Sequence, residues 1–247
     1  MQQNKKKDLC SDESRGECPS PRTAVGLTLV ELLVVIAILA LLVALAVPAA
    51  AASLRKTQNT QCLSKLRSLG SGIAFYSLDH DGEFPRSFHS CSGAGKLEWS
   101  RALFPYLDLP SDPSPAEWEQ HFNKTFRCPA DQQRDANIWS YALNVHFELS
   151  PDGDDYEGAP ATWNRFMNVP RPNATILLAE PRGNYFGDHL MCHQWSGLTG
   201  ARNALDSKRH GKTANYLFVD GHAESLTVEA TFDPSKNLNQ WNPSKAR

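Results

Sequence analysis

The chain has 247 residues, a formal net charge of −2 and 41% apolar residues. Its weakly acidic balance argues against a nucleic-acid-binding surface. About 165 residues follow the long helix predicted below, which is enough for one ordinary folded domain with its own core.

The first strong feature is an apolar segment near the N-terminus, in which residues 32–47 include no polar side chain. With its flanks it covers residues 27–52, and a bilayer core of about 30 Å needs roughly 20 helical residues. We therefore predict a membrane-spanning helix. Glu31 places a carboxylate inside it, and a charge in such a segment usually marks function. A secretory signal peptide cut near Ala49–Ala52 is the alternative.

This segment resembles the start of a type IV prepilin-like protein, a family that includes the pseudopilins of type II secretion. Gly26 occupies the position before the cut, residues 27–39 match the start of the pilin helix, and Pro48 matches its kinking proline. The resemblance implies cleavage between Gly26 and Leu27 by a prepilin peptidase, followed by N-methylation. Leu27 departs from the phenylalanine usual in the family.

The resemblance also implies a topology, with the leader, residues 1–26, in the cytoplasm and the rest anchored by a single pass in the inner membrane. The C-terminal domain then lies in the periplasm or outside the cell. Charge alone does not choose this orientation, because basic residues are nearly as frequent after the apolar segment as before it.

Glu31 has a physical role in such a subunit. Cleavage creates an α-amino group on Leu27, and a carboxylate on a neighbouring subunit's helix pairs with it, which lowers the cost of burying both charges. Glu31 and Pro48 are thus the predicted assembly residues. The alternative is that Glu31 simply lies at the membrane interface of a single-pass anchor.

The helix is predicted to continue in water over residues 53–80. Apolar residues recur there at helical spacing with polar residues between them, which indicates one apolar stripe; its members are Leu54, Cys62, Leu63, Leu66, Leu69, Ile73 and Tyr76. Asp79-His80-Asp81-Gly82 predicts the end of the helix, and Pro85 prevents its resumption.

Interior motifs are similar to those of a bacterial subfamily, the prepilin-type proteins with a His-x9-Asp-Gly domain. They include residues 61–70, 126–131, 140–144, 170–172 and 176–180, and they end with His210, Asp220 and Gly221. This resemblance covers nearly all of residues 27–227 and implies architecture more than activity.

Residues 81–247 are predicted to form a β-rich domain. Ile176–Ala179 is typical of a buried strand, and Ala214–Val219, Asp220-Gly221 and His222–Val228 predict a hairpin with a two-residue turn at positive φ. The predicted fold class is α+β: a long helix packed on an antiparallel sheet, as in pilins.

His210 and Asp220 invite a catalytic or metal-binding interpretation, but an extended strand of about 20 Å would separate them. We expect a structural role, with Asp220-Gly221 shaping the turn and His210 bonding to nearby backbone. A functional site at this motif is the alternative. Gly211-Lys212-Thr213 is not a phosphate-binding loop, because it lacks the earlier glycine and precedes a strand.

Two further groups of polar residues offer ligands for a metal ion. His189, Cys192 and His193 with Asp188 offer zinc-type ligands without the paired spacing of a zinc site, and are expected to be loop or core residues. The acidic segment 152–155 offers oxygen ligands, and some pseudopilins bind calcium in a loop. It lacks the helix–loop–helix calcium pattern, so a solvated turn is expected, with calcium as the alternative. No other cofactor or metal is predicted.

Four cysteines follow the leader: Cys62, Cys91, Cys128 and Cys192. Outside the cytoplasm they can form disulfides, with three connectivities for two bonds, and at least one bridge is expected.

Together these features predict a non-enzymatic pilin-like or pseudopilin subunit that assembles with copies of itself or sibling subunits. The first alternative is an unprocessed single-pass anchor displaying a ligand-binding domain. The second is a membrane-tethered enzyme acting on polysaccharide, which would need two facing carboxylates in a deep pocket.

Overall fold

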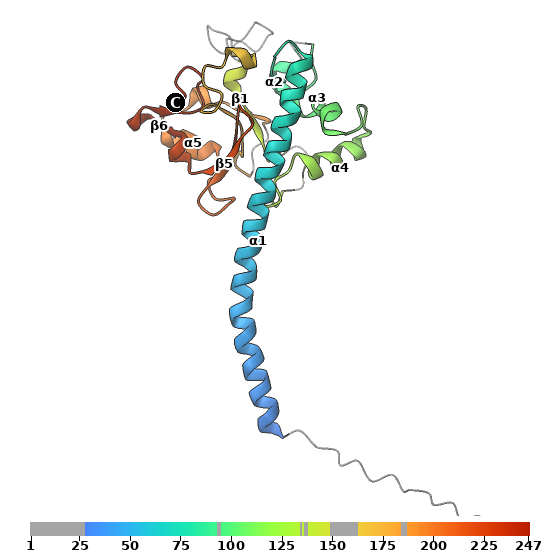
Figure 1. The fold of residues 1–247 in the computed structure, drawn as a ribbon, viewed down its shortest axis with the longest axis vertical. Helices are drawn as coiled ribbons and strands as arrows, with labels where there is room; N and C mark the ends of the chain where they lie inside the picture. Colours follow the sequence, from blue (N-terminus) through green and yellow to red (C-terminus); the bar gives the residue numbers. More distant parts are fainter. Residues whose placement is uncertain (1–27, 93–94, 134, 136–137, 149–162, 184–186) are drawn as a thin grey trace, which may run out of the picture. The chain divides into compact units, whose positions relative to one another are not determined.

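In the computed structural model, residues 28–92, 95–133, 135, 138–148, 163–183 and 187–247 are described. The chain divides at Pro48 into two units, residues 1–48 and 49–247. The helix α1 (Leu29–Asp79) contributes to both units (Figure 1). The second unit adds short helices and a mostly antiparallel sheet, so the predicted α+β class is confirmed.

A reciprocal pair of hydrogen bonds caps the first turn of α1. The Glu31 N–H donates to Thr28 Oγ1 over 3.2 Å, and the Thr28 N–H donates to Glu31 Oε2 over 2.8 Å. This is a capping box, whose signature is Thr-x-x-Glu. Glu31 therefore has a local role at the helix start in addition to the intersubunit role expected from the sequence.

The first part of α1 is apolar and exposed. Its large apolar side chains from Leu29 to Val47 are between 48% and 78% exposed. The helix is long and apolar enough to cross a membrane. Pro48 lies inside it and has no N–H to donate to the Ala44 carbonyl; the kink expected there stays a prediction.

The second part of α1 buries the apolar stripe expected from its periodicity. Cys62, Leu66, Leu69, Ile73 and Tyr76 are all buried in one hydrophobic core. Leu54, the first member of this stripe, is 59% exposed. Apolar residues recur at helical spacing from the apolar segment onward, but the first buried residue of α1 is Cys62.

The stop signal after α1 is confirmed. The helix ends at Asp79, and Asp81 and Gly82 both have positive φ. The Gly82 N–H donates back to the Ser77 carbonyl over 2.7 Å. This bond is the one that closes a Schellman motif. It gives the Ser77 carbonyl, which has no acceptor role left inside the helix, a hydrogen-bond donor.

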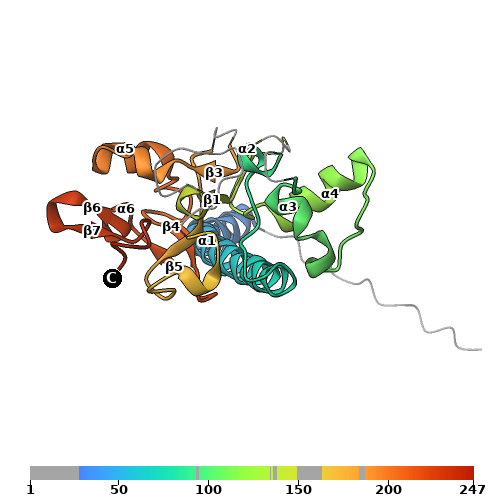
Figure 2. The same ribbon diagram turned by 90° about the horizontal axis from the view of Figure 1, so that it is seen from above.

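The second unit surrounds this part of α1 from two sides. Figure 2 shows β4 and β5 on one side of α1 and α3 and α4 on the other. Core residues come from both sides, including Leu178 and Leu217 of the sheet and Trp99 and Phe122 of the helices. Among the described residues, the α-helices after α1 are α2 (Phe88–Cys91), α3 (Trp99–Ala102), α4 (Pro115–Thr125), α5 (Leu198–Ala204) and α6 (Val228–Thr231).

Within the described residues, the main sheet has five strands in the order β3-β1-β2-β4-β5. All its neighbouring pairs are antiparallel except β1 and β3, which are parallel. Its strands are β1 (Ala142–Asn144), β2 (Ile176–Ala179), β3 (His189–Leu190), β4 (Ala214–Phe218) and β5 (Ala223–Leu226), while β6 (Phe232–Asp233) and β7 (Leu238–Asn239) form a separate pair. The predicted buried strand at 176–179 is confirmed.

The β4–β5 hairpin is confirmed, but its turn differs from the prediction. Phe218 donates to the His222 carbonyl, and Gly221 donates back to the Phe218 carbonyl over 3.0 Å. Three residues therefore form the loop, and of Asp220 and Gly221 only the glycine has positive φ, at 90°. This is the three-residue hairpin in which a glycine bulge follows a turn, rather than the two-residue type with positive φ at both positions.

Both faces of the sheet are covered. In β4, Leu217 faces the core that contains α1, whereas Tyr216 and Phe218 belong to a second core with residues of α5, α6 and β6. Gly70 of α1 lies against Leu217, and a Cβ placed there would approach its Cδ1 to 2.9 Å. The glycine lets the helix lie close to the sheet.

Candidate functional site

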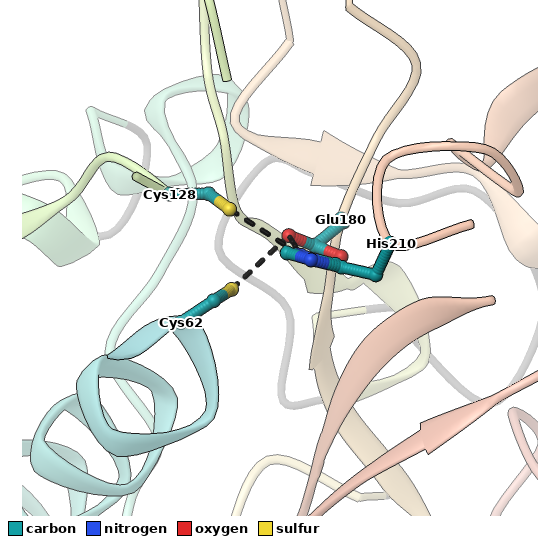
Figure 3. A group of neighbouring side chains, drawn as sticks. All are labelled: Cys62, Cys128, Glu180 and His210. Atoms are coloured by element: carbon teal, nitrogen blue, oxygen red, sulfur yellow. Dashed lines mark hydrogen bonds and ion pairs between the residues drawn. The ribbon is translucent and has the colours of Figure 1, made fainter. Parts of the chain in front are cut away.

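A buried cluster of four polar side chains lies where α1 meets the sheet. Cys62 comes from α1, Cys128 from the segment after α4, Glu180 from the position after β2, and His210 from the turn before β4. Figure 3 shows the four side chains pointing toward one another. Their sulfur, nitrogen and oxygen atoms all lie within 4.8 Å of one another.

Hydrogen bonds link the four groups. The Cys62 thiol donates to Glu180 Oε1 over 3.1 Å, and His210 Nε2 lies 3.0 Å from the same oxygen. The distance from Cys128 Sγ to His210 Nε2 is 3.4 Å. Cys62 and Glu180 have no exposed surface, Cys128 is 1% exposed, and the side chain of His210 is 1% exposed. The cluster is thus closed to solvent and internally connected.

Neighbouring groups hold the Glu180 carboxylate in place. The backbone N–H of Asn215 donates to Oε2 over 2.8 Å, and Arg209 Nη1 lies 3.5 Å from Oε1. The Arg209 guanidinium also pairs with Asp206 at 3.0 Å and Asp131 at 3.7 Å. A buried carboxylate needs such compensation, because an unpaired charge in the interior is very costly.

This surrounding charge determines the protonation of the cluster. Burial raises the pKa of the Glu180 carboxyl, but Arg209 and the hydrogen bond from His210 outweigh burial and hold that pKa below its usual range. Burial lowers the pKa of His210, whereas its hydrogen bonds to Cys128 and Glu180 raise that pKa to about 9. Glu180 and His210 are therefore an ion pair at neutral pH.

The pKa values of the two thiols in the cluster shift in opposite directions. The neighbouring Cys62 thiol lowers the pKa of Cys128 to about 7, against the effect of burial and with the help of His210. Burial, reinforced by the neighbouring Cys128 and Glu180, raises the pKa of Cys62 well above its ordinary value. Cys128 is consequently the thiol of the pair that ionises first.

The histidine and the aspartate of the His-x9-Asp-Gly motif lie apart in the structure. His210 and Asp220 flank the two ends of β4. His210 bonds to nearby backbone as expected, since its N–H donates to the Thr213 carbonyl over 3.4 Å. Its side chain also bonds to Glu180 and Cys128, two partners that the expectation did not include. Asp220 instead pairs with His222 in the hairpin turn. The expected role of Asp220 and Gly221 in shaping that turn agrees with this geometry.

All four cysteines expected to offer disulfides are free thiols in the structure. The sulfurs of Cys62 and Cys128 lie together in the cluster. Cys91 donates to the Phe88 carbonyl over 3.4 Å, and Cys192 donates to Asn144 Oδ1 over 2.9 Å. The pairing of these residues stays a prediction.

The other residues weighed for metal binding do not form one group in the described parts of the chain. His189 pairs with Asp188 at 3.0 Å, and the Cys192 thiol bonds to Asn144 instead. His193 stacks edge-on against His146. The acidic segment 152–155 and the processing residues Gly26 and Leu27 lie outside the described residues.

Sequence reasoning missed the cluster because its members are dispersed along the chain. Each nevertheless lies in one of the motifs already noted: Cys62 in 61–70, Cys128 in 126–131, Glu180 at the end of 176–180, and His210 at the start of the last motif. Tyr141, from the motif 140–144, adds its hydroxyl 3.2 Å from Cys62 Sγ. Five of the segments that carry the resemblance thus meet at the cluster, whereas Asp220 and Gly221 lie at the other end of β4.

A second feature is an open cavity of about 770 Å³ beside α3 and α4. Its walls include the indoles of Trp118 and Trp139 and the carboxylates of Glu98 and Asp188. Aromatic walls with a few polar groups are typical of a ligand site. The Arg101 guanidinium lies over the Trp118 ring at 4.2 Å.

Both carboxylates of this cavity have structural partners. Glu98 caps α3 by accepting from the Ser100 N–H over 3.0 Å, and Asp188 accepts from the Phe88 N–H over 2.7 Å. Burial raises the pKa of Glu98 to about 6, against the hydrogen bonds from Ser100. The cavity therefore has a carboxyl that titrates near neutrality next to apolar walls.

Comparison with known proteins gives no identification: no family model, no curated protein and no solved structure matches the chain.

Proposed function

We propose that this chain is a pilin-like or pseudopilin subunit, cleaved after Gly26 and assembled through the apolar part of α1 into a type IV pilus or a type II secretion-like filament. The observation that carries the proposal is the exposed apolar surface from Leu29 to Val47. A surface of this size requires a membrane or the helices of other subunits to cover it.

The start of α1 supports the proposal. Cleavage would place the new amino group on Leu27, one residue before the capping residue Thr28, and within the described chain both Thr28 donors bond to the same oxygen of Glu31, Oε2. The carboxylate therefore has a second oxygen with which to pair with the amino group of a neighbouring subunit. Such a pair would fix the register of adjacent helices in an apolar environment, where a lone charge is costly.

The second unit would remain outside the membrane and contact other subunits or cargo. It has its own core around the second part of α1, so it does not depend on the apolar part for a hydrophobic interior. Prepilin peptidase, the inner membrane and sibling subunits are the partners that this function implies, with methylation of the new N-terminus.

Two variants separate the assembly role of Glu31 from its capping role. Glu31→Gln keeps an acceptor for the Thr28 N–H but removes the charge, whereas Thr28→Ala weakens the cap and keeps the charge. We expect chemical crosslinking of native membranes to yield subunit multimers for wild type and Thr28→Ala, and to yield few for Glu31→Gln. Equal crosslinking of all three proteins would refute the charge-pairing role.

The alternative function is an unprocessed single-pass anchor that displays a ligand-binding domain. The cavity lined by Trp118 and Trp139 favours it, because aromatic walls beside Glu98 and Asp188 suit a polar ring such as a sugar. Retention of residues 1–26 in the cellular protein, together with saturable binding of oligosaccharides to wild type but not to Trp118→Ala, would establish this alternative.

A further inference from the structure

The cluster of Cys62, Cys128, Glu180 and His210 holds the donor set of a metal centre. Two sulfurs, one imidazole nitrogen and one carboxylate oxygen lie within 4.8 Å of one another in a place closed to solvent. From this geometry we propose that the four side chains bind a single Zn²⁺ ion, a site that joins α1 to the sheet of the second unit.

The distances suit a tetrahedral ion. Zinc bonds of about 2.0–2.3 Å imply neighbouring ligand atoms about 3.3–3.8 Å apart. The separations of 3.0 Å between His210 Nε2 and Glu180 Oε1, and of 3.4 Å between His210 Nε2 and Cys128 Sγ, differ from that range by a few tenths of an ångström at most. The contact of 3.1 Å between Cys62 and Glu180 is similarly close. All donor pairs of the four residues lie within 4.8 Å, so binding of the ion requires the widest pair to close by about 1 Å.

The donor types favour zinc over the common divalent ions that prefer oxygen ligands. Thiolates and imidazole favour zinc over magnesium and calcium, which prefer oxygen ligands. Four protein ligands and no solvent access correspond to a structural zinc site, whose coordination is complete, rather than to a catalytic site with an open position.

The charges of the ligands also favour a cation. Zinc binding releases the protons of the two thiols and of the imidazole nitrogen to solvent. Two thiolates and the carboxylate of Glu180 then face the ion, which leaves one net negative charge on the ion and its ligands. The Arg209 guanidinium lies 3.5 Å from Glu180 Oε1 and reduces the cost of this charge, although it is shared with Asp131 and Asp206.

Outer groups fix the ligands as they do in zinc proteins. The Asn215 N–H holds Glu180 Oε2 at 2.8 Å and leaves Oε1 for the ion, and the Tyr141 hydroxyl lies 3.2 Å from the Cys62 sulfur. Such contacts orient ligands and raise metal affinity. The ion would link four segments that the chain otherwise holds together by packing and hydrogen bonds.

The test measures zinc in the full chain purified in detergent. We expect about one equivalent of zinc per chain in wild type and a loss of at least about tenfold in Cys128→Ala. Cys192→Ala is the matched control, because it removes another buried thiol outside the cluster and should keep its zinc. Absence of zinc from wild type after dialysis against Zn²⁺, or equal loss in the two variants, would overturn the proposal.

Cobalt substitution keeps the test independent of how the variants fold. Wild type stripped with a chelator and loaded with Co²⁺ should show the visible bands of tetrahedral cobalt and a sulfur-to-cobalt charge-transfer band in the ultraviolet. The competing arrangement is a Cys62–Cys128 disulfide, which lowers the intact mass by two hydrogen atoms and gives no such spectrum. Isolation of that disulfide from the native protein would refute the zinc site.

Discussion

Substitution of Leu66 by alanine tests whether the second part of α1 is the core of the folded unit. The Leu66 side chain is fully buried among helices and sheet. Leu66→Ala removes three carbons, which costs about 2.4 kcal/mol at about 0.8 kcal/mol for each buried group. The cavity left behind raises the expected loss of unfolding free energy to about 3–4 kcal/mol.

The same substitution in the apolar part of the helix is the control. Leu39 is 54% exposed, so Leu39→Ala should change the unfolding free energy of the second unit by less than about 0.5 kcal/mol. Urea unfolding in detergent, followed by tryptophan fluorescence, separates the two, because all six tryptophans lie between Trp99 and Trp241. Equal effects of both substitutions, or a loss below about 1 kcal/mol for Leu66→Ala, would refute this account of the core.

Three further predictions concern protonation and backbone conformation. Burial and the nearby His193 lower the pKa of His146 to about 4. The folded state therefore loses about 3 kcal/mol of unfolding free energy as the pH falls from 6.5 through 4. Urea titrations should show this loss in wild type and not in His146→Gln. Burial raises the pKa of Glu98 to about 6, so ionisation of Glu98 destabilises the folded state as the pH rises from 4.5 through 6. The unfolding free energy of Glu98→Gln should therefore rise by about 2 kcal/mol relative to that of wild type between pH 4.5 and pH 7. A free-energy difference between the two proteins that does not change with pH would contradict this sign. Gly221→Ala should cost about 1 kcal/mol because its φ is 90°, whereas Gly183→Ala, which has equal space and no positive φ, should be near neutral by thermal unfolding.

The sequence was informative wherever one physical signal dominated. The helical period from Leu66 to Tyr76, the stop at Asp79–Gly82 and the strand at Ile176–Ala179 all follow from local pattern, and the structure has each of them. The same pattern includes Leu54, which is 59% exposed, because a helical period shows which residues share a face but not which of them other segments cover.

Other features depend on long-range contacts and had no local signal. The strand β3 has only two residues, His189 and Leu190, and it owes its existence to parallel pairing with β1. The turn at Asp220-Gly221 was assigned to the wrong type, since the dipeptide allows either loop length and the strand register decides between them. The Thr28–Glu31 capping box does have a local signature, Thr-x-x-Glu. It was missed because Glu31 was interpreted only as a charge in a membrane helix.

The candidate metal cluster depends entirely on long-range contacts. Cys62 belongs to a helix, His210 to a turn, and Cys128 and Glu180 to segments between them, so only the tertiary fold brings their ligand atoms together. None of the spacings between these residues corresponds to a zinc pattern that can be recognised in a sequence. The motifs indicated which segments belong together, but not the chemistry at the point where they meet.

Intact mass and N-terminal peptide mapping of the protein from its native membrane test the central proposal most directly. A mature chain that begins at Leu27, with or without an added methyl group, is the predicted result. A chain that keeps Lys5–Lys7 would contradict processing and make the protein a plain anchor, and a start near Ala50 would make it a secreted domain.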